Sequence, residues 1–384
     1  MKIPVGKAGT AIAVLLLALS FTPLLAQSQH VDNPGQTPMQ VNDEIIPRHT
    51  VLPPQLTAGI ATRAVVQPNG QVIQAASTPL TTWNGSFVSG TSTFTFNMVG
   101  TAPSTGISTT VQAFIIPIKL VVGTHTFDPQ TVLSNGKTVV NNTIASPVFA
   151  TGVDFTSGGV DMGATQYIDA YQRANFWGTV SAHTGYHLLL GGPTIQPEVT
   201  LTVPKRSGTT GTPFGHLAAE VDINYFNGQI QTIMQNTAAI LPNTLPIFVI
   251  YDTYLTQNHS CCIGGYHSSF GLTSAPQSYA VFSYVDHPGD FSQDVSALSH
   301  EIGEWADDPL VVNNGNSTPC GSLENGDPLE NTANFGGFPY TLGGFTYNLQ
   351  DLVTMPYFGA PPSTSVNNEF TFQGQHLTVC QNGS

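Results

Sequence analysis

Residues 290–309 read DFSQDVSALSHEIGEWADDP and predict one amphipathic helix. We expect Asp290 or Ser292 to cap its start, because a short polar side chain can accept a backbone hydrogen bond there. Asp308 should end it, since the residue before Pro309 disfavours helical backbone. The side chains of this helix predict the chemistry of the C-terminal half of the chain.

The two faces of this helix differ in chemistry. At about 100° per residue, one side is apolar and the opposite side carries a histidine and a carboxylate. The apolar side holds Val295, Leu298, Ile302 and Trp305, and the polar side holds His300 and Glu304. Small residues flank the boundary (Ser296, Ser299 and Gly303), so a neighbouring strand or loop can approach closely. One face is therefore expected to pack and the other to present ligands.

His300 and Glu304 stand four residues apart, the spacing that brings two side chains to one metal ion, as in the HExxH pattern of zinc peptidases. Zinc accepts both imidazole nitrogen and carboxylate oxygen. Glu301 occupies the position of the general base that takes a proton from metal-activated water. The Gly- and Asn-rich link 313–322 then allows either Glu324 or Asp327 to return as the third ligand.

The charge pattern supports a bound cation. Arg206 is the last strong base of the chain, whereas many Asp and Glu residues crowd between Asp286 and Glu330. Carboxylates buried in such a region need a counter-charge, and a metal ion can supply it. Zinc, as one ion, is the expected cofactor, and calcium is the alternative because it also binds crowded carboxylates. Nucleic acid is excluded as a partner, since no basic stripe could neutralise phosphates.

The first residues have the order of a secretory signal peptide. Lys2 and Lys7 precede an apolar run, and Ala26 precedes a polar segment, so cleavage is expected after residue 26. The run is too short to span a membrane, and no later stretch is long enough. We therefore expect a secreted or periplasmic protein without a membrane span.

The remaining chain divides by composition into three parts. Residues 27–80 form a Pro- and Gln-rich extended arm, and residues 81–206 form a β-rich region with one helix near residues 165–177. Residues 207–384 form the metal-binding part, beginning at a Gly- and Thr-rich segment. In that part we expect a second helix around residues 230–234 and a strand over residues 245–251.

The four cysteines are Cys261, Cys262, Cys320 and Cys380. Export to an oxidising compartment permits disulfides, and we favour the pair Cys320 and Cys380. Adjacent cysteines rarely bond each other because the geometry is strained, so the state of Cys261 and Cys262 stays open.

The run SHEIGEWADDP at residues 299–309 resembles the HExxExxTDP or HExxExxTNP signature of secreted bacterial zincin-like proteins and of the plant exordium (phosphate-induced protein 1) family. Three further pieces resemble these families in the same order. They are ENGD at 324–327, which is similar to E-I-A/G-D, the segment from Cys262 to Ser269, which is similar to CGxH, and FTYN at 345–348. The chain departs from the pattern at Asp307, where the family usually has Thr, and at Pro328-Leu329, where plant members have Leu-Cys.

The resemblance implies an α+β fold, with a β-rich N-terminal part followed by a zincin-like domain that holds a metal-binding active-site helix. In it His300 and Glu304 would bind the ion, with Glu301 as catalytic base. His267 and Asp308 are candidates for a supporting role beside the ligands.

We expect a secreted zinc-dependent hydrolase, in particular a metallopeptidase acting on a peptide or cell-wall-associated substrate. The alternative is an extracellular or cell-surface binding protein in which the metal is structural and no catalysis takes place. The plant relatives are discussed as cell-wall growth factors, which keeps this alternative open.

Overall fold

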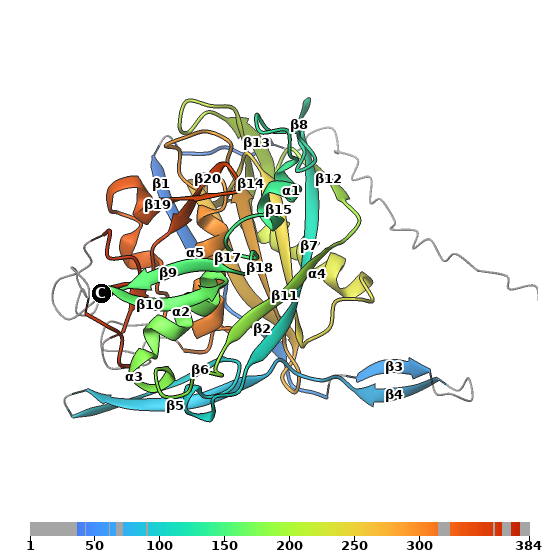
Figure 1. Cartoon of the computed structure of the whole chain (residues 1–384). Helices are drawn as coiled ribbons and strands as arrows, with labels where there is room; N and C mark the ends of the chain where they lie inside the picture. Colours follow the sequence, from blue (N-terminus) through green and yellow to red (C-terminus); the bar gives the residue numbers. More distant parts are fainter. Residues whose placement is uncertain are drawn as a thin grey trace, which may run out of the picture.

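The computed structural model describes residues 37–42, 44–60, 62–66, 72–89, 91–313, 323–355, 358–362 and 370–376 (Figure 1). The predicted signal peptide 1–26 and the predicted disulfide partners Cys320 and Cys380 lie outside these residues. Cys261 and Cys262, whose state the sequence left open, form a disulfide with each other. Among the described residues, none of the helices combines the length and the apolar character that crossing a bilayer would take.

A mixed sheet of twelve strands organises the molecule. Its main path runs through β11 (Leu188–Ile195), β7 (Thr109–Val122), β15 (Thr244–Tyr251), β18 (Gln277–Tyr284), β17 (Ser260–Leu272), β16 (Thr253–Gln257), β14 (Ala218–Asp222) and β13 (Gly208–Gly211). Four strands join it from the side: β1 (Ile45–Val51) and β2 (Gln55–Thr57) pair with β17, and β8 (His125–Phe127) and β12 (Val199–Val203) pair with β7.

Five two-stranded sheets complete the β-structure of the described residues. They are β3 (Thr62–Val66) with β4 (Val72–Ala76), β5 (Thr82–Ser89) with β6 (Ser92–Val99), β9 (Val153–Ser157) with β10 (Val160–Thr165), β19 (Gly337–Leu342) with β20 (Phe345–Gln350), and β21 (Val353–Thr354) with β22 (Phe370–Thr371). Short 3₁₀ turns lie at Pro103–Thr105, Asp327–Leu329 and Ala333–Gly336.

Both faces of the sheet are covered, because its central strands are apolar on both sides. In β15, Leu245, Ile247 and Val249 pack into one core, and Phe248 and Ile250 pack into another. The first core includes residues of α2 (Tyr167–Asn175) and α5 (Ser296–Asp307), and the second includes residues of α4 (Ile223–Asn236). Figure 1 shows α2 and α5 on the opposite side of the sheet from α4. The short helix α1 (Val139–Ile144) contributes Val139 and Val140 to the first core, and α3 (Trp177–Val180) contributes Val180 to a separate apolar cluster.

The predicted helix exists but begins later than expected. Neither Asp290 nor Ser292 caps it: the N-cap is Val295, which makes no side-chain cap bond. The reason is local backbone shape, since Ser292 and Asp294 have positive φ angles of 66° and 41° and turn the chain just before the helix. Its end agrees with the prediction, because Asp308 is the C-cap.

The small residues of α5 allow β20 and the residues after it to lie against the helix. The backbone N–H of Gln350 donates to Ser299 Oγ at 2.8 Å. A Cβ atom on Gly303 would lie 2.4 Å from Leu352 Cδ1, so only glycine accommodates Leu352 there. The expectation that a neighbour approaches closely along this side is confirmed.

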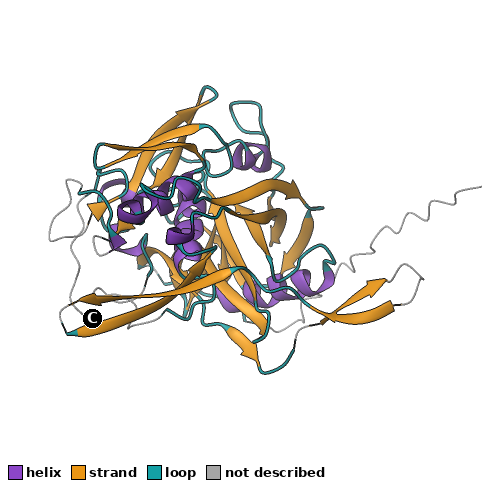
Figure 2. Ribbon diagram, turned by 60° about the horizontal axis from the view of Figure 1, so that its bottom comes forward, coloured by secondary structure: helices purple, strands orange, loops and turns teal. Residues whose placement is uncertain are grey.

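The predicted fold class, α+β with a β-rich N-terminal part followed by a zincin-like domain, is wrong. Figure 2 shows how far strands dominate the molecule. Strands from both predicted parts belong to one mixed sheet: β7 and β11 precede residue 207, and β15, β17 and β18 follow it. The Gly- and Thr-rich segment where the parts were expected to meet includes β13, which pairs with β14. β7 is apolar on both faces, as a strand in the interior of a covered sheet usually is. It takes such a position by pairing with β15 from the other half of the chain.

Residues of the predicted N-terminal arm also join the sheet. β1 pairs in parallel with β17, with Arg48 opposite Ile263 and Val51 opposite His267. The other edge of β17 pairs with β16 and β18. The arm therefore supplies an additional strand directly beside His267.

Candidate metal centre

The helix α5 places His300 and Glu304 together, as their spacing predicts. His300 Nε2 lies 3.0 Å from Glu304 Oε1, and both side chains are buried, as is that of Glu301. Every residue of α5 is buried, so the ligand-bearing face is covered like the apolar face. The face that was expected to present ligands is therefore buried.

The acidic loop returns to the helix, as the sequence predicts. Asp327 Oδ1 lies 3.5 Å from His300 Nε2. The backbone N–H groups of Gly326 and Asp327 donate to Glu304 Oε1 at 3.1 Å and 3.3 Å. His300, Glu304 and Asp327 can each offer one ligand atom such that all three atoms lie within 4.8 Å of one another.

Glu324 approaches Glu304 in a different group. Ligand atoms of His267, Glu304 and Glu324 also lie within 4.8 Å of one another. The choice between Glu324 and Asp327 that the sequence left open is therefore not exclusive, because the structure brings both carboxylates to Glu304.

Gln350 orients His300, a role the sequence did not reveal. His300 Nδ1 lies 3.0 Å from Gln350 Oε1, and Gln350 Nε2 donates to the carbonyl of Gly326 at 3.0 Å. Since the amide nitrogen is engaged with Gly326, the amide oxygen faces His300 and accepts the proton of Nδ1. This leaves the lone pair of Nε2 directed at Glu304 and Asp327, the arrangement that metal-binding histidines usually have.

Glu301 lies against the predicted supporting residue His267. Glu301 Oε2 is 3.2 Å from His267 Nδ1, which is also 3.8 Å from Glu304 Oε2. Both His267 and Glu301 are completely buried. Gly265 on β17 makes this contact feasible, because a Cβ atom there would lie 2.8 Å from Glu301 Oε1.

His49 and Glu330 also belong to the site, and sequence reasoning missed both. The rings of His49 and His300 lie with centroids 3.9 Å apart, and His49 Nδ1 is 2.8 Å from Glu330 Oε1. With His300 they form a third group of potential ligands. His49 carries no spacing signal in the sequence, and only the pairing of β1 with β17 brings it here.

The two acids that end α5 have separate positions. Asp308, predicted to support the ligands, accepts the backbone N–H of Val312 at 2.9 Å and shapes the turn after the helix. Asp307 accepts hydrogen bonds from Tyr171, Gln172 and Asn325. Asp307 thus connects α2 to the loop that carries Gly326 and Asp327.

The electrostatics of the buried cluster favour a cation. Burial raises the pKa values of Glu301, Glu304 and Glu324 well above their usual range. Burial opposes protonation of His300, but the hydrogen bond to Asp327 and the charges of Glu301 and Asp327 raise its pKa to about 9. Burial, assisted by the charge of His300, lowers the pKa of His267 to about 3. A divalent cation would favour the deprotonated form of all these groups at once.

The donor set fits a zinc ion. Ligand atoms arranged tetrahedrally around one zinc, at about 2.0–2.2 Å each, lie roughly 3.3–3.6 Å apart. His300 Nε2 lies 3.0 Å from Glu304 Oε1 and 3.5 Å from Asp327 Oδ1, close to this range. Calcium prefers six to eight oxygen ligands, so the histidines favour zinc or a related transition metal.

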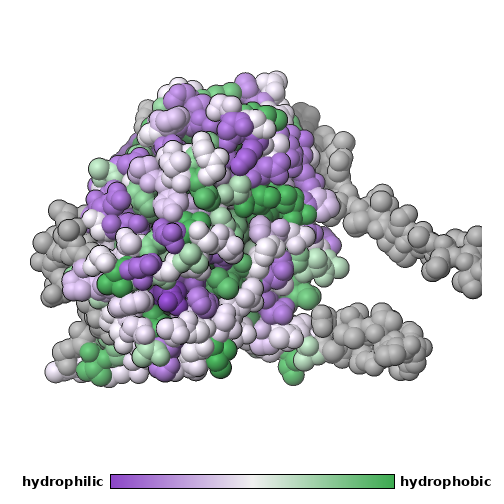
Figure 3. Space-filling view, in the orientation of Figure 1, coloured by the Kyte–Doolittle hydropathy of each residue, from purple (hydrophilic) through white to green (hydrophobic). Residues whose placement is uncertain are grey.

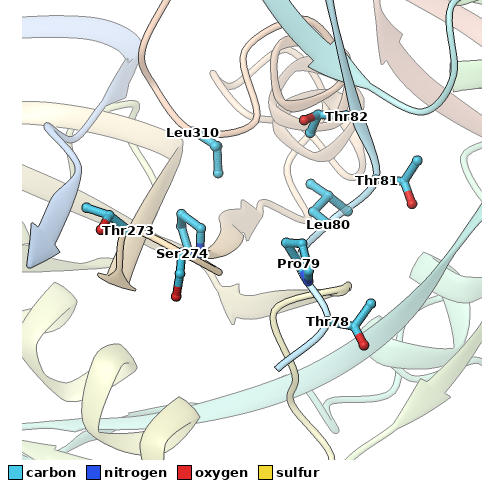
Figure 4. A pocket seen from close by; sticks show the side chains of 9 residues that line it. Thr78, Pro79, Leu80, Thr81, Thr82, Thr273, Ser274 and Leu310 are labelled. Carbon is cyan, nitrogen blue, oxygen red and sulfur yellow. The ribbon is translucent and has the colours of Figure 1, made fainter. Parts of the chain in front are cut away.

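The larger surface hollows do not coincide with this cluster. A cavity of about 500 Å³ is lined by Thr78, Pro79, Leu80, Thr81, Thr82, Thr273, Ser274, Pro276 and Leu310 (Figure 4). This lining offers no charged side chain. On the face seen in Figure 3, hydrophilic and hydrophobic residues are intermixed. None of the candidate metal ligands lines this cavity.

Comparison of the chain with known protein families, with curated proteins and with solved structures finds no match.

Proposed function

We propose that this chain is an exported zinc-dependent hydrolase, with peptides as the substrate class. The observation that carries the proposal is the group of His300, Glu304 and Asp327, whose ligand atoms lie within 4.8 Å of one another with Glu301 adjacent in the helix. The resemblance of residues 299–309 to the HExxExxTDP signature supports the same reading. The apolar run and polar boundary at residues 1–26 support export.

In this proposal each residue has a separate task. His300, Glu304 and Asp327 would hold the ion, which when bound would polarise a carbonyl and lower the pKa of a water molecule. Glu301 would accept a proton from the attacking water and return it to the leaving amine. His267 lies beside this carboxylate, with Nδ1 3.2 Å from Glu301 Oε2. Gln350 keeps the proton of His300 on Nδ1, so that Nε2 is free to coordinate.

Burial of the site favours a second candidate function. The side chains of His300 and Glu304 are 0% and 1% exposed, whereas that of Asp327 is 44% exposed. A substrate would reach the ligands past Asp327 or after movement of β1. If neither path operates, the metal is structural, and the protein is an extracellular binding protein without hydrolytic activity.

The Glu301→Gln variant separates the two functions. For a hydrolase, we expect it to retain the zinc content of the wild type and to lose about 10²–10⁴-fold in turnover, because only the proton acceptor is removed. Zinc is measured by elemental analysis, and hydrolysis is measured on a library of quenched fluorescent peptides. Glu220→Gln, a buried carboxylate on β14 outside the cluster, is the matched control and should retain activity.

Two results would reject the hydrolase. One is unchanged hydrolysis in Glu301→Gln on any peptide that the wild type cleaves. The other is a wild type without activity on the whole library whose melting temperature falls strongly on chelation, which identifies a structural metal. If the wild type contains no zinc and His300→Ala does not differ from it in zinc content, both candidate functions are rejected.

A further inference from the structure

Glu304 lies between two groups of ligands and faces each with a different oxygen. Its Oε1 atom is 3.0 Å from His300 Nε2, on the side of Asp327. Its Oε2 atom is 3.8 Å from His267 Nδ1, on the side of Glu324. A carboxylate with ligands on both sides has the geometry of a bridge between two metal ions.

One ion cannot take all of these ligands. Ligands at about 2.0–2.2 Å from one ion lie at most roughly 4.4 Å apart, even when they are opposite each other. The ligand atoms form separate groups within 4.8 Å: His300, Glu304 and Asp327 in one, and His267, Glu304 and Glu324 in the other. Glu304 is the residue that the two groups share.

The third group of ligands, formed by His49, His300 and Glu330, does not add another ion in the same way. A neutral imidazole has one lone pair, and His300 Nδ1 is engaged with Gln350 Oε1 at 3.0 Å. His300 can therefore serve one ion only, whereas a carboxylate can serve two. His49 Nδ1 is already paired with Glu330 at 2.8 Å.

Several buried side-chain atoms of the cluster have no hydrogen-bond partner among the described residues, and both oxygens of Glu324 are among them. Glu324 is 8% exposed, and apart from Glu304, with which its carboxyl group can share a proton, its oxygens have no hydrogen-bond partner among the described residues. Glu304 is fully buried, and its Oε2 atom likewise has no other partner among them. A buried carboxylate oxygen without a partner destabilises the folded chain. Binding of one ion by His300, Glu304 Oε1 and Asp327 would not relieve this destabilisation.

The charge balance points the same way. The cluster contains five carboxylates, from Glu301, Glu304, Glu324, Asp327 and Glu330, and no Lys or Arg follows Arg206 in the chain. Arg48, which precedes His49 on β1, donates to Gln257 at 3.2 Å, and its charge also acts on Glu330. When all five carboxylates are deprotonated, one divalent ion balances two of their negative charges and two ions balance four.

We propose that the chain binds two divalent transition-metal ions, and that Glu304 bridges them. His300 and Asp327 complete the first site, and His267 and Glu324 complete the second. The first site is the one on which the proposed function rests, and the second goes beyond it. Two ions about 3.5–4 Å apart are a recurrent arrangement in hydrolytic sites, where they hold both the attacking and the leaving oxygen.

The test is the number of ions that each chain holds after equilibration with zinc and removal of loosely bound metal by gel filtration. We expect two zinc ions per chain for the wild type and one for Glu324→Gln, which removes only the second site. Asp327→Asn should also hold one ion, because it removes a ligand of the first site. Glu220→Gln, a buried carboxylate outside the cluster, should still hold two.

The possible outcomes separate this inference from the proposed function. One ion in the wild type that Glu324→Gln retains would overturn the second site and leave the proposed zinc site standing. One ion that Glu324→Gln loses would overturn the bridge and the proposed zinc site at Asp327. No ion in the wild type would overturn both. If Glu324→Gln does not fold, His267→Gln is the second variant for the same site and should also hold one ion.

Loading with Mn²⁺ provides a second test, which does not depend on counting the ions bound to each chain. Two Mn²⁺ ions bridged by Glu304 should give an exchange-coupled paramagnetic resonance spectrum in the wild type. Glu324→Gln should give the spectrum of an isolated Mn²⁺ ion instead. An isolated-ion spectrum in the wild type loaded with two equivalents would contradict the bridge.

Discussion

Gly326 leaves no room for a side chain at the centre of the site. A Cβ atom there would lie 2.2 Å from His300 Nδ1 and 2.5 Å from His300 Cε1. Its φ and ψ of −88° and −37° are ordinary for any residue, so the requirement for glycine is steric and not conformational. The glycine lets Gln350 and Glu304 bond to its backbone while the imidazole lies against it.

We therefore expect Gly326→Ala to push the loop away from His300. Overpacking of this kind costs about 1–3 kcal/mol, and the shift of Asp327 should weaken zinc binding at least about tenfold. Zinc affinity and melting temperature measure the two effects. Gly228→Ala on α4, where a Cβ atom meets nothing within 4 Å, is the control and should not lower either quantity. Equal affinity in the two variants would refute the steric argument.

Gln350→Ala tests whether the amide positions His300. Without it, the proton can move from Nδ1 to Nε2, and the ring is free to turn. Loss of such an outer hydrogen bond typically lowers metal affinity by about 10–100-fold. Competition with a chromophoric chelator measures the change. Gln373→Ala, whose side chain contacts the carbonyl of Thr156 instead, should bind zinc like the wild type.

At the scale of elements, the site is assembled by four segments of the chain. α5 supplies His300, Glu301 and Glu304, the loop after it supplies Glu324 and Asp327, and β1 and β17 supply His49 and His267. β1 acts as a cover, because it pairs with the edge of β17 and lays His49 on the ring of His300. Access of solvent and chelators to the ions therefore depends on the stability of the pairing between β1 and β17.

His49→Ala should loosen this cover without removing a ligand of either proposed site. We expect zinc to be lost to excess chelator about tenfold faster than from the wild type, because His49, with a side chain that is 0% exposed, no longer shields His300. Stopped-flow measurement of metal release gives the rate. His125→Ala on the exposed part of β8 serves as the control. Unchanged release in His49→Ala would show that β1 is not the barrier.

At the scale of the whole molecule, the buried titratable groups make stability depend on pH. Burial raises the pKa of Glu330 to about 8 and of Asp307 to about 7, and the pKa of His300 is raised to about 9. Each of these groups binds its proton more tightly in the folded chain than in the unfolded chain. The folded chain therefore loses stability as the pH rises through these values.

The metal-free protein should accordingly melt at a lower temperature at pH 8.5 than at pH 6.5, by about 2–5 °C. His267 and His49 have lowered pKa values, so they make the folded chain more stable as the pH rises. This gain occurs mostly below their usual pKa of 6.5 and therefore does not offset the loss above it. With zinc the trend should flatten or reverse, because deprotonated ligands bind metal better. Thermal melts with chelator and with zinc compare the two states. A melting temperature in chelator that rises over this range would contradict the assignment.

Local features of the sequence predict much of the secondary structure near the site. The apolar spacing places α2, α4 and β15, and the HExxE spacing places His300 beside Glu304, because these patterns act between residues of one helix or strand. The return of an acidic loop is also predicted, since the Gly- and Asn-rich link 313–322 allows it and crowded carboxylates without Lys or Arg can share a cation.

The fold class and the outer members of the site depend on contacts between distant residues. His49 and Glu330 lie 281 residues apart in the chain, and nothing in the local sequence of either predicts their contact. The same holds for β7 and β15, which join the two halves in one sheet. Spacing along a helix is a local property of the backbone, whereas the pairing of strands and the burial of a site depend on the folding of the whole chain.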